Sequence, residues 1–478
     1  MSPSLTLQAR WRVVEADGAA HLLYYGVRNP PRHREQWVPV SAELAALLGG
    51  GGLEMPSSGP LREEAERLAA AGILVAPEAV REAKTPETMQ VCTRCVTNDY
   101  VIPGLEFNKQ GVCALCQCYE QSKGPSRAVL ATITPEELKA LAAGNEASRF
   151  DAMVLYTGGK DSSYMLWLLA RKLGLRVLAA FWNMPYCTDA AYENIRRAKR
   201  RMPEVEFVEW TLPERMVREA MNSKWRSQGW PCLCPTAAFP TLYPLAAHLR
   251  IPCVFLGLED VQAAVLDHVF SSGGGGPAAE PTRRERTLSF LEARAVPRAL
   301  KDPVRWADEM SNYHAAVVAA MPELFRDLED LARRARRDPE VHLPLIVRLA
   351  TNEQYGSWED ARRIIETEMD WQAPAGQNNL LHTSCAIEPV KDYLQFQRFK
   401  AMRTVFMPQS IVETGAAVFF GLTSRVEALK AVEELGYWRP PEILDRLAGD
   451  LGVTADGVRA SSDEMRFSLG EWAAGSPE

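Results

Sequence analysis

Residues suited to binding an anion gather in the short stretch Thr157–Ser163, which reads TGGKDSS. Its two glycines allow the backbone to approach a ligand closely. The hydroxyls of Thr157, Ser162 and Ser163 can donate hydrogen bonds, and Lys160 supplies a positive charge. The stretch follows the apolar run DAMVLY and precedes a helical pattern, so it is expected to join a strand to a helix. Because free N–H groups and the dipole at a helix N-terminus favour a phosphate, this stretch is predicted to bind phosphate groups.

The stretch does not follow the GxxxxGKS/T pattern of the common phosphate-binding loop, in which lysine and a hydroxyl residue are adjacent. Here Lys160 is followed by Asp161, and no glycine lies five residues before Gly159. An aspartate beside an anion is repulsive unless it caps the helix or helps to hold Mg²⁺. We expect Asp161 to have one of these two roles.

The residues TGGKDS resemble the SGGxDS signature of the PP-loop ATP pyrophosphatases, with Thr157 in the position of the first serine. In that family the loop binds the pyrophosphate portion of ATP, and the enzyme transfers AMP to a substrate oxygen. A nitrogen or sulfur nucleophile then displaces the adenylated oxygen. The resemblance implies an enzyme that uses ATP and Mg²⁺ and releases AMP and pyrophosphate. It implies nucleotide contacts from Thr157, Gly158, Gly159, Lys160, Asp161, Ser162 and Ser163, with catalytic roles for Lys160, Asp161 and Ser162.

A second segment, FLGLEDVQAAVL, resembles the GHNxDD segment that follows a later strand in tRNA-thiolating PP-loop enzymes. The match consists of Gly257, Asp260 and the helix expected downstream, whereas the histidine and one aspartate are absent. The resemblance implies that Gly257, Glu259 and Asp260 contact ATP or Mg²⁺. The alternative is a strand end followed by a polar helix cap.

The ten cysteines are unevenly distributed, and a disulfide framework is not expected in a reducing compartment. Four of them form two Cys-x2-Cys pairs, and four thiolates in such pairs suit a tetrahedral structural zinc ion. The segment around them reads CTRCV, then PGLEF, then GVCALC, and resembles the N-terminal element of the N-acetyl sugar amidotransferase branch of PP-loop enzymes. This likeness covers roughly residues 90–265. The predicted zinc ligands are Cys92, Cys95, Cys113 and Cys116.

Three further cysteines, Cys232, Cys234 and Cys385, form a second candidate set. Thiolating PP-loop enzymes hold an iron–sulfur cluster with a cysteine pair and a third cysteine farther on, and Cys232 and Cys234 resemble that pair with a C-x-C spacing. The likeness implies a cluster with one iron open to sulfide, or a persulfide on one of the thiols. Cys187 competes with Cys385 for the third position. The alternative is that these are buried thiols, as cysteines commonly are.

Elements that could position these residues begin near residue 150. Apolar runs at DAMVLY, RVLAAFW, VEFVEW and PCVFLGL alternate with helical patterns over Ser162–Leu173, about 189–201 and 213–226. Apolar strands alternating with helices predict an α/β fold with a doubly wound parallel sheet covered on both faces. The resemblance implies that this sheet is of the HUP/PP-loop type.

Residues 1–88 are expected to form a small α+β domain. Two alternating stretches flank the hairpin signal ADGA, and a helix is expected to begin after Ser41. The arrangement resembles the winged-helix-like peptide-recognition domains attached to enzymes that modify ribosomally made peptides. It implies a bound peptide, and the alternative is a packing or oligomerisation domain.

The rest of the chain divides into three further regions. Residues 89–125 are the four-cysteine zinc element, and residues 146–425 are the PP-loop domain, with a helical insertion over about 287–370. A helical C-terminal tail follows over residues 426–478. The stretch 271–286, SSGGGGPAAEPTRRER, is typical of a flexible connector.

Bulk composition limits the partners. The chain has 478 residues, 47% hydrophobic and 24% charged, which suggests a globular protein of two to four domains. No apolar run reaches the roughly 18 residues that span a bilayer, and the first residues lack a signal-peptide pattern. We therefore expect a cytoplasmic protein with no membrane partner. The net charge of −7 disfavours a nucleic-acid partner, although a local basic patch stays open.

Three functions remain open on these grounds. The main prediction is an amidotransferase-like enzyme that adenylates a sugar, metabolite or peptide and uses ammonia from a separate glutaminase subunit. The second is a sulfurtransferase that thiolates a tRNA base, metabolite or peptide with sulfur from a separate donor. The third is a non-catalytic scaffold that binds ATP or a peptide, and the intact TGGKDS stretch makes it the weakest of the three.

Overall fold

The computed structural model describes most of the chain. The described residues are 4–16, 18–31, 36–121, 131–228, 230–257, 262, 281–297, 306–349, 356–375, 381–435 and 440–451. Side chains are described for most, but not all, of these positions.

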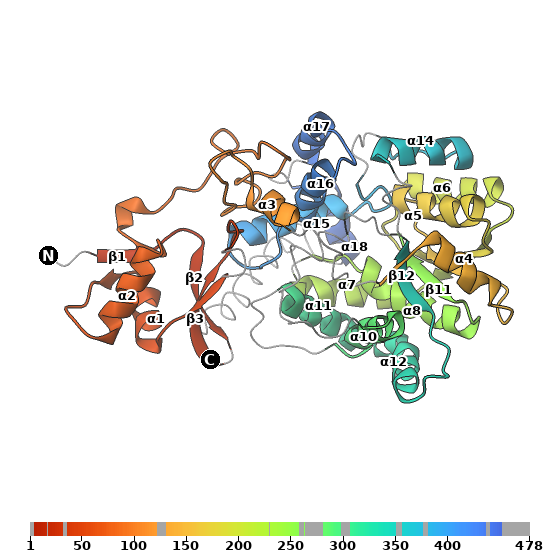
Figure 1. Ribbon diagram of the computed structural model, residues 1–478, viewed down its shortest axis with the longest axis horizontal. Helices are drawn as coiled ribbons and strands as arrows, with labels where there is room; N and C mark the ends of the chain where they lie inside the picture. Colours follow the sequence, from red (N-terminus) through yellow and green to blue (C-terminus); the bar gives the residue numbers. More distant parts are fainter. Residues whose placement is uncertain are drawn as a thin grey trace.

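A six-stranded sheet forms the centre of the molecule, and every pair of neighbouring strands in it is parallel (Figure 1). Three adjacent strands, Val177–Asn183, Ala152–Leu155 and Cys253–Leu256, have side chains that are almost wholly buried, as expected for a parallel sheet with both faces covered. The edge strand β10 is more exposed. In spatial order the strands are β10 (Glu206–Thr211), β9 (Val177–Asn183), β8 (Ala152–Leu155), β11 (Cys253–Leu256), β12 (Leu345–Leu349) and β7 (Ala131–Ile133).

Helices cover both faces of this sheet, which confirms the predicted doubly wound α/β fold (Figure 1). One face carries α5 (Lys160–Trp167), which continues as a π-helix over Leu168–Lys172, together with α6 (Asp189–Arg201) and α14 (Trp358–Met369). The other face carries α8 (Cys234–His248), α10 (Arg283–Ala295) and α12 (Pro322–Arg337). Beside them, α7 (Glu214–Gln228) packs against α11 (Trp306–Ala320).

Two strands of the sheet come from parts of the sequence where none was expected. β7 lies before residue 146, where the PP-loop domain was expected to begin, and is followed by α4 (Pro135–Ala143). β12 lies within residues 287–370, which were expected to be helical. A run of five residues, LIVRL, is too short to show whether it is strand or helix. In the structure it is a strand that pairs with β11 on one side and β7 on the other.

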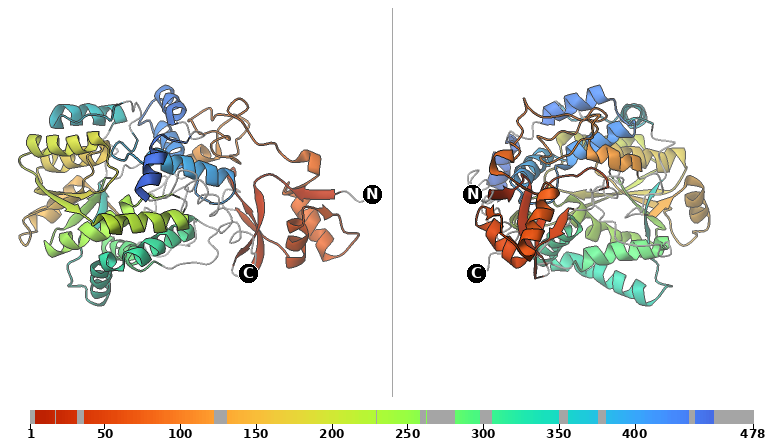
Figure 2. Two further views of the ribbon diagram at one scale, coloured as in Figure 1. Left: turned by 180° about the vertical axis from the view of Figure 1, so that it is seen from behind. Right: turned by 60° about the vertical axis from the view of Figure 1, so that its left-hand side comes forward.

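The first 80 or so residues form a small α+β unit that has a core of its own, as predicted. It has two three-stranded sheets, and α1 begins after Ser41, whose side chain accepts a hydrogen bond from the Leu44 N–H. Figure 2 shows this unit at one end of the long axis of the molecule, with the large sheet at the other end. Its elements are β1 (Ser4–Leu7), β2 (Trp11–Ala16), β3 (Ala19–Tyr24), β4 (Trp37–Pro39), α1 (Ala42–Gly49), β5 (Leu53–Glu54), α2 (Pro60–Ala70) and β6 (Leu74–Val75).

A third region of helices lies between these two units (Figures 1 and 2). The cysteine-rich segment ends in α3 (Ala114–Gln121) and packs on helices from the last quarter of the chain. Those helices are α15 (Glu388–Lys400), α16 (Gln409–Phe419), α17 (Arg425–Leu435) and α18 (Ile443–Leu451). The expected connector over 271–286 lies mostly outside the described residues, as does the tail beyond residue 451. In the part of the chain that is described, no helix is long and apolar enough to cross a bilayer.

Candidate functional site

The TGGKDSS stretch lies between β8 and α5, at the carboxyl end of a central strand, as expected. Gly158 has a φ of +74°, a conformation that residues with a Cβ rarely adopt. A Cβ at Gly158 would also lie 2.4 Å from the carbonyl oxygen of Ala191 in α6. Both the turn and the close approach of the neighbouring helix therefore require glycine here.

The carbonyl of Gly158 is held by two buried side chains from distant parts of the chain. It accepts hydrogen bonds from Asn194 Nδ2 at 3.2 Å and from Trp371 Nε1 at 3.0 Å. Asn194 also bonds to the backbone of Gln372 in both directions. The loop is thus fixed to α6 and to the segment after α14, which keeps its N–H groups in place before any ligand arrives.

The three predicted hydroxyls do not all face the same way. Thr157 Oγ1 and Ser162 Oγ lie 3.0 Å apart, and Ser162 Oγ accepts the Thr157 N–H at 3.2 Å. The side chain of Ser163 is fully buried, and its oxygen lies 3.3 Å from the hydroxyl of Tyr156. Thr157 and Ser162 are therefore placed at the loop, whereas the Ser163 hydroxyl is directed into the core.

Lys160 is the buried cation of the loop. Its side chain is almost fully buried, pairs with the carboxylate of Asp161, and lies with Nζ 5.1 Å from the ring centroid of Trp358. The cation–π contact and the carboxylate offset part of the cost of removing the ammonium from water. The Asp161 carboxylate is partly exposed, whereas the Lys160 side chain is not, so a cation from solvent can reach the carboxylate of this pair.

Two residues that the sequence analysis did not predict, Thr383 and Ser384, contact the loop. The backbone N–H of Lys160, in the first turn of α5, donates to Thr383 Oγ1 at 2.9 Å. A Cβ on Gly159 would lie 3.1 Å from Ser384 Oγ and 3.2 Å from Thr383 Oγ1. The segment Thr383–Ser384 therefore rests on the N-terminus of α5, the position where a phosphate is expected to bind.

Gly257 lies next to this loop, as expected for a residue at the end of the neighbouring strand. A Cβ there would come within 2.8 Å of Ser162 Cβ and 3.0 Å of its Cα. Glycine at this position thus lets β11 and the start of α5 pack closely. Glu259 and Asp260, predicted to contact ATP or Mg²⁺, lie outside the described residues.

Alanine at Gly158 is expected to destabilise the protein more than alanine at Gly174. Both have positive φ, which costs an alanine about 1–2 kcal/mol. At Gly174 an added Cβ would meet nothing within 4 Å, whereas at Gly158 it would overlap Ala191, costing about 1–3 kcal/mol more. Urea unfolding of the two variants measures the difference. Equal losses would show that the loop does not pack on α6 as described.

The four cysteines of the two Cys-x2-Cys pairs come together, as predicted. Their sulfurs all lie within 4.8 Å of one another and all four residues are buried. The Cys95–Cys113 and Cys92–Cys116 sulfur separations are 3.8 and 4.0 Å. Four ligands at the Zn–S distance of about 2.3 Å would be separated by about 3.8 Å. The group thus fits a single tetrahedral metal ion held by Cys92, Cys95, Cys113 and Cys116.

This four-cysteine element is joined to the C-terminal helices. Arg425 donates to the carbonyls of Cys95 and Cys92, each at 2.9 Å. A Cβ on Gly415 in α16 would lie 2.8 Å from Thr97 and 3.5 Å from Cys95 Sγ. Because α16 packs directly on the cluster, loss of the metal is expected to disturb this helix as well.

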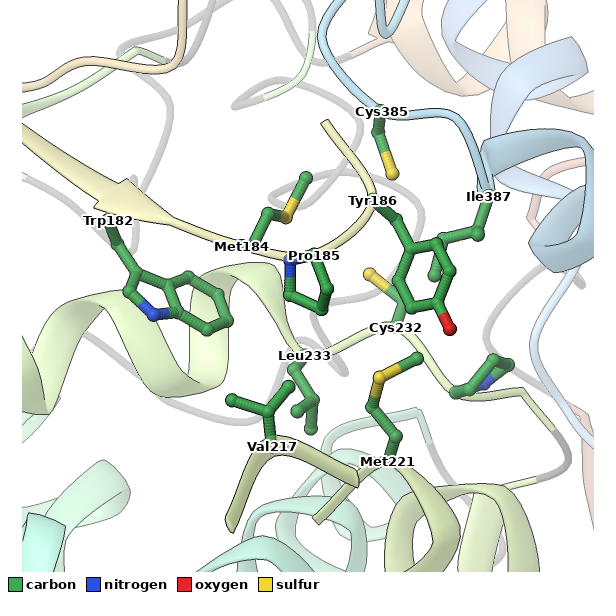
Figure 3. Close-up of a pocket in the computed structure, with 11 residues that line it drawn as sticks. Trp182, Met184, Pro185, Tyr186, Val217, Met221, Cys232, Leu233, Cys385 and Ile387 are labelled. Carbon is green, nitrogen blue, oxygen red and sulfur yellow. The ribbon is translucent and has the colours of Figure 1, made fainter. Parts of the chain in front are cut away.

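Members of the second set of cysteines line a small, mainly apolar cavity of about 20 Å³ at the carboxyl end of β9. Cys232 and Cys385 both line it, and Figure 3 shows their sulfurs among Met184, Pro185 and Tyr186. The cavity has room for about one water-sized group. The side chain of Cys234, the third predicted member of this set, lies outside the described residues, whereas the backbone of Cys234 begins α8.

Cys187, the competing third member, lies directly opposite Cys385 in an isolated antiparallel bridge. Its thiol is buried, and burial raises its pKa to about 12. The thiol is therefore neutral near pH 7. The structure thus brings Cys232 and Cys385 to one cavity and places Cys187 against Cys385.

A cluster of buried charged residues begins three residues before Cys385. His382 Nε2 lies 3.0 Å from Glu413 Oε2 and 3.5 Å from Glu388 Oε1. Burial alone would lower the pKa of His382, but the two carboxylates raise it to about 9. Glu388 also pairs with Lys391. Next along α15, Asp392 accepts hydrogen bonds from Ser410 Oγ, and burial raises its pKa to about 7.

This charged cluster ties the start of α15 to α16, and so positions the segment 382–385 that contacts both the loop and the thiol cavity. Sequence reasoning missed it, because its members are spread over two helices and carry no spacing signal.

Comparisons with known proteins give no evidence on the family or activity of this chain. No protein-family model and no curated protein matches the sequence. Among solved structures, the U34-tRNA thiolase NcsA from Methanococcus maripaludis, with its 4Fe-4S cluster, is similar at 12% sequence identity. The match covers 58% of this chain and 87% of that chain, with a TM-score of 0.20. A likeness of this size carries no information about activity or substrate.

Proposed function

We propose that the protein is an ATP pyrophosphatase of the PP-loop type that transfers AMP to an acceptor oxygen and then replaces this oxygen with sulfur. The observation that carries the proposal is the segment Thr383–Cys385. Its threonine contacts the N–H of Lys160, and its cysteine, two residues later, lines the thiol cavity with Cys232. The expected phosphate site and the thiols thus share one short segment.

The loop would bind the β and γ phosphates of ATP. Backbone N–H groups at the start of α5 and the hydroxyls of Thr157 and Ser162 would donate hydrogen bonds, and Lys160 would neutralise charge on the leaving pyrophosphate. Asp161 would exchange its contact with Lys160 for Mg²⁺ bound to the phosphates.

Two displacements complete the reaction. The acceptor oxygen attacks the α-phosphorus, the bond to the bridging oxygen breaks, and pyrophosphate leaves. A sulfur nucleophile then attacks the acceptor carbon, the carbon–oxygen bond breaks, and AMP leaves with that oxygen. The apolar lining of the thiol cavity would keep water from competing with the sulfur in the second step.

The size of the cavity around Cys232 and Cys385 limits the form in which the transferred sulfur can be held. A persulfide adds one sulfur atom to Cys232 or Cys385, which a cavity of about 20 Å³ can hold. An iron–sulfur cluster, with several iron and sulfide atoms, would require the walls of the cavity to move apart. We therefore propose a persulfide that is loaded by a separate sulfur donor. After its outer sulfur has displaced AMP, the thiol of the other cysteine attacks the cysteine sulfur of the bridge, the sulfur–sulfur bond breaks, and the thiolated product leaves. An external thiol such as glutathione then reduces the Cys232–Cys385 disulfide that remains.

The nitrogen route shares the first displacement and differs in the nucleophile. It is supported by the four-cysteine element, whose spacing resembles that of the sugar amidotransferase branch. Under this alternative, ammonia would come from a separate glutaminase subunit, and the thiol cavity would have no part in transfer.

Replacing Cys232 or Cys385 with serine distinguishes the two routes. Each variant is incubated with ATP, Mg²⁺, a ³⁵S-labelled persulfide donor or ¹⁵N-labelled ammonium, and candidate acceptors (N-acetyl sugars, tRNA, peptides). On the sulfur route, both variants should lose ³⁵S transfer and the AMP release that accompanies it, and should keep the first-turnover rate of pyrophosphate formation within about twofold. Cys253→Ser, which changes a buried thiol in β11, is the matched control. Incorporation of ¹⁵N that none of these changes affects would overturn the sulfur route, and an absorbance band near 400 nm in the purified protein would indicate a cluster instead of a persulfide.

A further inference from the structure

Cys187 and Cys385 have the backbone geometry of a cross-strand disulfide pair. They are bridge partners, flanked by hydrogen bonds from the Ala386 N–H to the Tyr186 carbonyl at 2.8 Å and from the Thr188 N–H to the Ser384 carbonyl at 3.0 Å. The two cysteines are thus a non-hydrogen-bonded antiparallel pair. Such pairs have Cα atoms about 4.5 Å apart and side chains on the same face. Disulfides span Cα separations of about 4.4–6.8 Å.

The pair joins the two segments that meet beside the anion loop. Cys187 lies between β9 and α6, and the next residue, Thr188, caps α6 and donates from Oγ1 to the Thr383 carbonyl at 3.2 Å. Cys385 follows Thr383 and Ser384, which rest on Gly159 and Lys160. A covalent link between the cysteines would therefore hold Thr383 against the start of α5.

We propose that Cys187 and Cys385 form a reversible disulfide that fixes the segment Thr383–Ser384 on the anion loop and weakens ATP binding there. The second part rests on the proposed function, which places ATP at this loop. The first part depends only on the two thiols and their pairing.

A small-molecule disulfide such as oxidised glutathione is the oxidant. Cys385, the more exposed thiol, attacks it, and one glutathione leaves as its thiol while a mixed disulfide forms on Cys385. The sulfur of Cys187 then attacks this mixed disulfide. The Cys187–Cys385 bond forms, the bond to glutathione breaks, and a second glutathione leaves. Two protein thiols are thus oxidised and one small disulfide is reduced, with each proton passing to a departing glutathione.

The expected consequence for ATP follows from the contact of Thr383 with Lys160. In the reduced protein, a phosphate can displace Thr383 Oγ1 from the Lys160 N–H. In the oxidised protein the segment is tethered, so this N–H stays occupied. Loss of one hydrogen bond to a charged phosphate corresponds to a Kd for ATP about tenfold or more higher.

The test holds the full-length protein in glutathione buffers of increasing oxidised fraction, traps free thiols with N-ethylmaleimide, and identifies linked peptides by mass spectrometry. A Cys187–Cys385 link that dithiothreitol removes is expected, and it should be absent from Cys187→Ser and present in Cys253→Ser. Failure to find this link, or its replacement by a Cys232–Cys385 link, would overturn the pairing.

Equilibrium binding of ATP to the same samples tests the consequence. Oxidised wild type should bind about tenfold or more weakly than reduced wild type, whereas Cys187→Ser should bind equally well in both buffers. Equal affinity of reduced and linked wild type would overturn the claimed effect on the loop. If reduced wild type binds no ATP, the proposed function fails, while the peptide mapping still decides the disulfide.

Discussion

Lys160→Ala is expected to lower the rate of AMP and pyrophosphate formation by about 10²–10³-fold, the usual effect of removing one preorganised charge that stabilises a leaving group. The ammonium of Lys160 is buried in the loop beside Asp161, at the start of α5. Without Lys160, only the N–H and hydroxyl groups of the loop would stabilise the charge on the departing pyrophosphate. Asp161→Ala should have a similar effect if the Asp161 carboxylate exchanges its contact with Lys160 for Mg²⁺ when ATP binds. Product formation is measured by separating AMP, ADP and pyrophosphate chromatographically.

The control for this prediction is a measurement of whether each variant still folds. Circular dichroism and thermal unfolding should show both variants folded, because the loop is also held by Asn194 and Trp371 through the Gly158 carbonyl. Lys199→Ala removes an exposed lysine of α6 and should leave product formation unchanged. Pyrophosphate release that survives both Lys160→Ala and Asp161→Ala would contradict the assignment of catalysis to this loop.

Cys92→Ser is expected to cause a much larger loss of stability than substitution of a cysteine outside the four-sulfur group. Structural zinc contributes about 10–16 kcal/mol of apparent folding free energy in small domains. Without the ion, the three sulfurs that remain, which are buried and lie within 4.8 Å of one another, have no common partner for their charge. The midpoint of thermal unfolding should fall by roughly 10 °C or more. Removing the metal with a chelator should have the same direction of effect on the wild type.

Cys118→Ser is the matched control for this second prediction, because Cys118 lies in the same helix, α3, and outside the four-sulfur group. It should unfold at nearly the wild-type temperature and keep the metal. Metal analysis of purified protein is expected to give one zinc ion per chain, and its loss in Cys92→Ser should accompany the loss of stability. An unchanged midpoint in Cys92→Ser, or the absence of any bound metal, would contradict the assignment of a metal site to these four cysteines.

The parts of the fold that could be predicted carry a local signal. The run DAMVLY, the two glycines and the helical pattern after them predict a strand, a tight turn and a helix, and β8 and α5 follow in that order. The spacing of the two Cys-x2-Cys pairs predicted that their four thiols come together, because each pair places two thiols on one turn. The short strands of the sheet were harder to predict from the sequence. β12 and β7 have five and three residues, and they are recognisable only by the strands beside them.

The surroundings of the loop could not be predicted for a different reason. Thr383 contacts Lys160 across 223 residues of sequence, and Trp371 contacts Gly158 across 213. No periodicity or spacing connects residues so far apart, and their meeting depends on the complete fold. The one available signal was Cys385 itself, as a member of the second candidate set of cysteines, and it does not show which residues the neighbouring Thr383 and Ser384 contact.

The most direct measurement of the central claim is the structure of the protein with an ATP analogue that cannot be cleaved between its α and β phosphates. The account predicts the β and γ phosphates against the N–H groups at the start of α5, near Lys160, with Thr383 displaced and the α-phosphorus facing the thiol cavity. Phosphates bound elsewhere, or a γ-phosphate turned toward the cysteines, would contradict it.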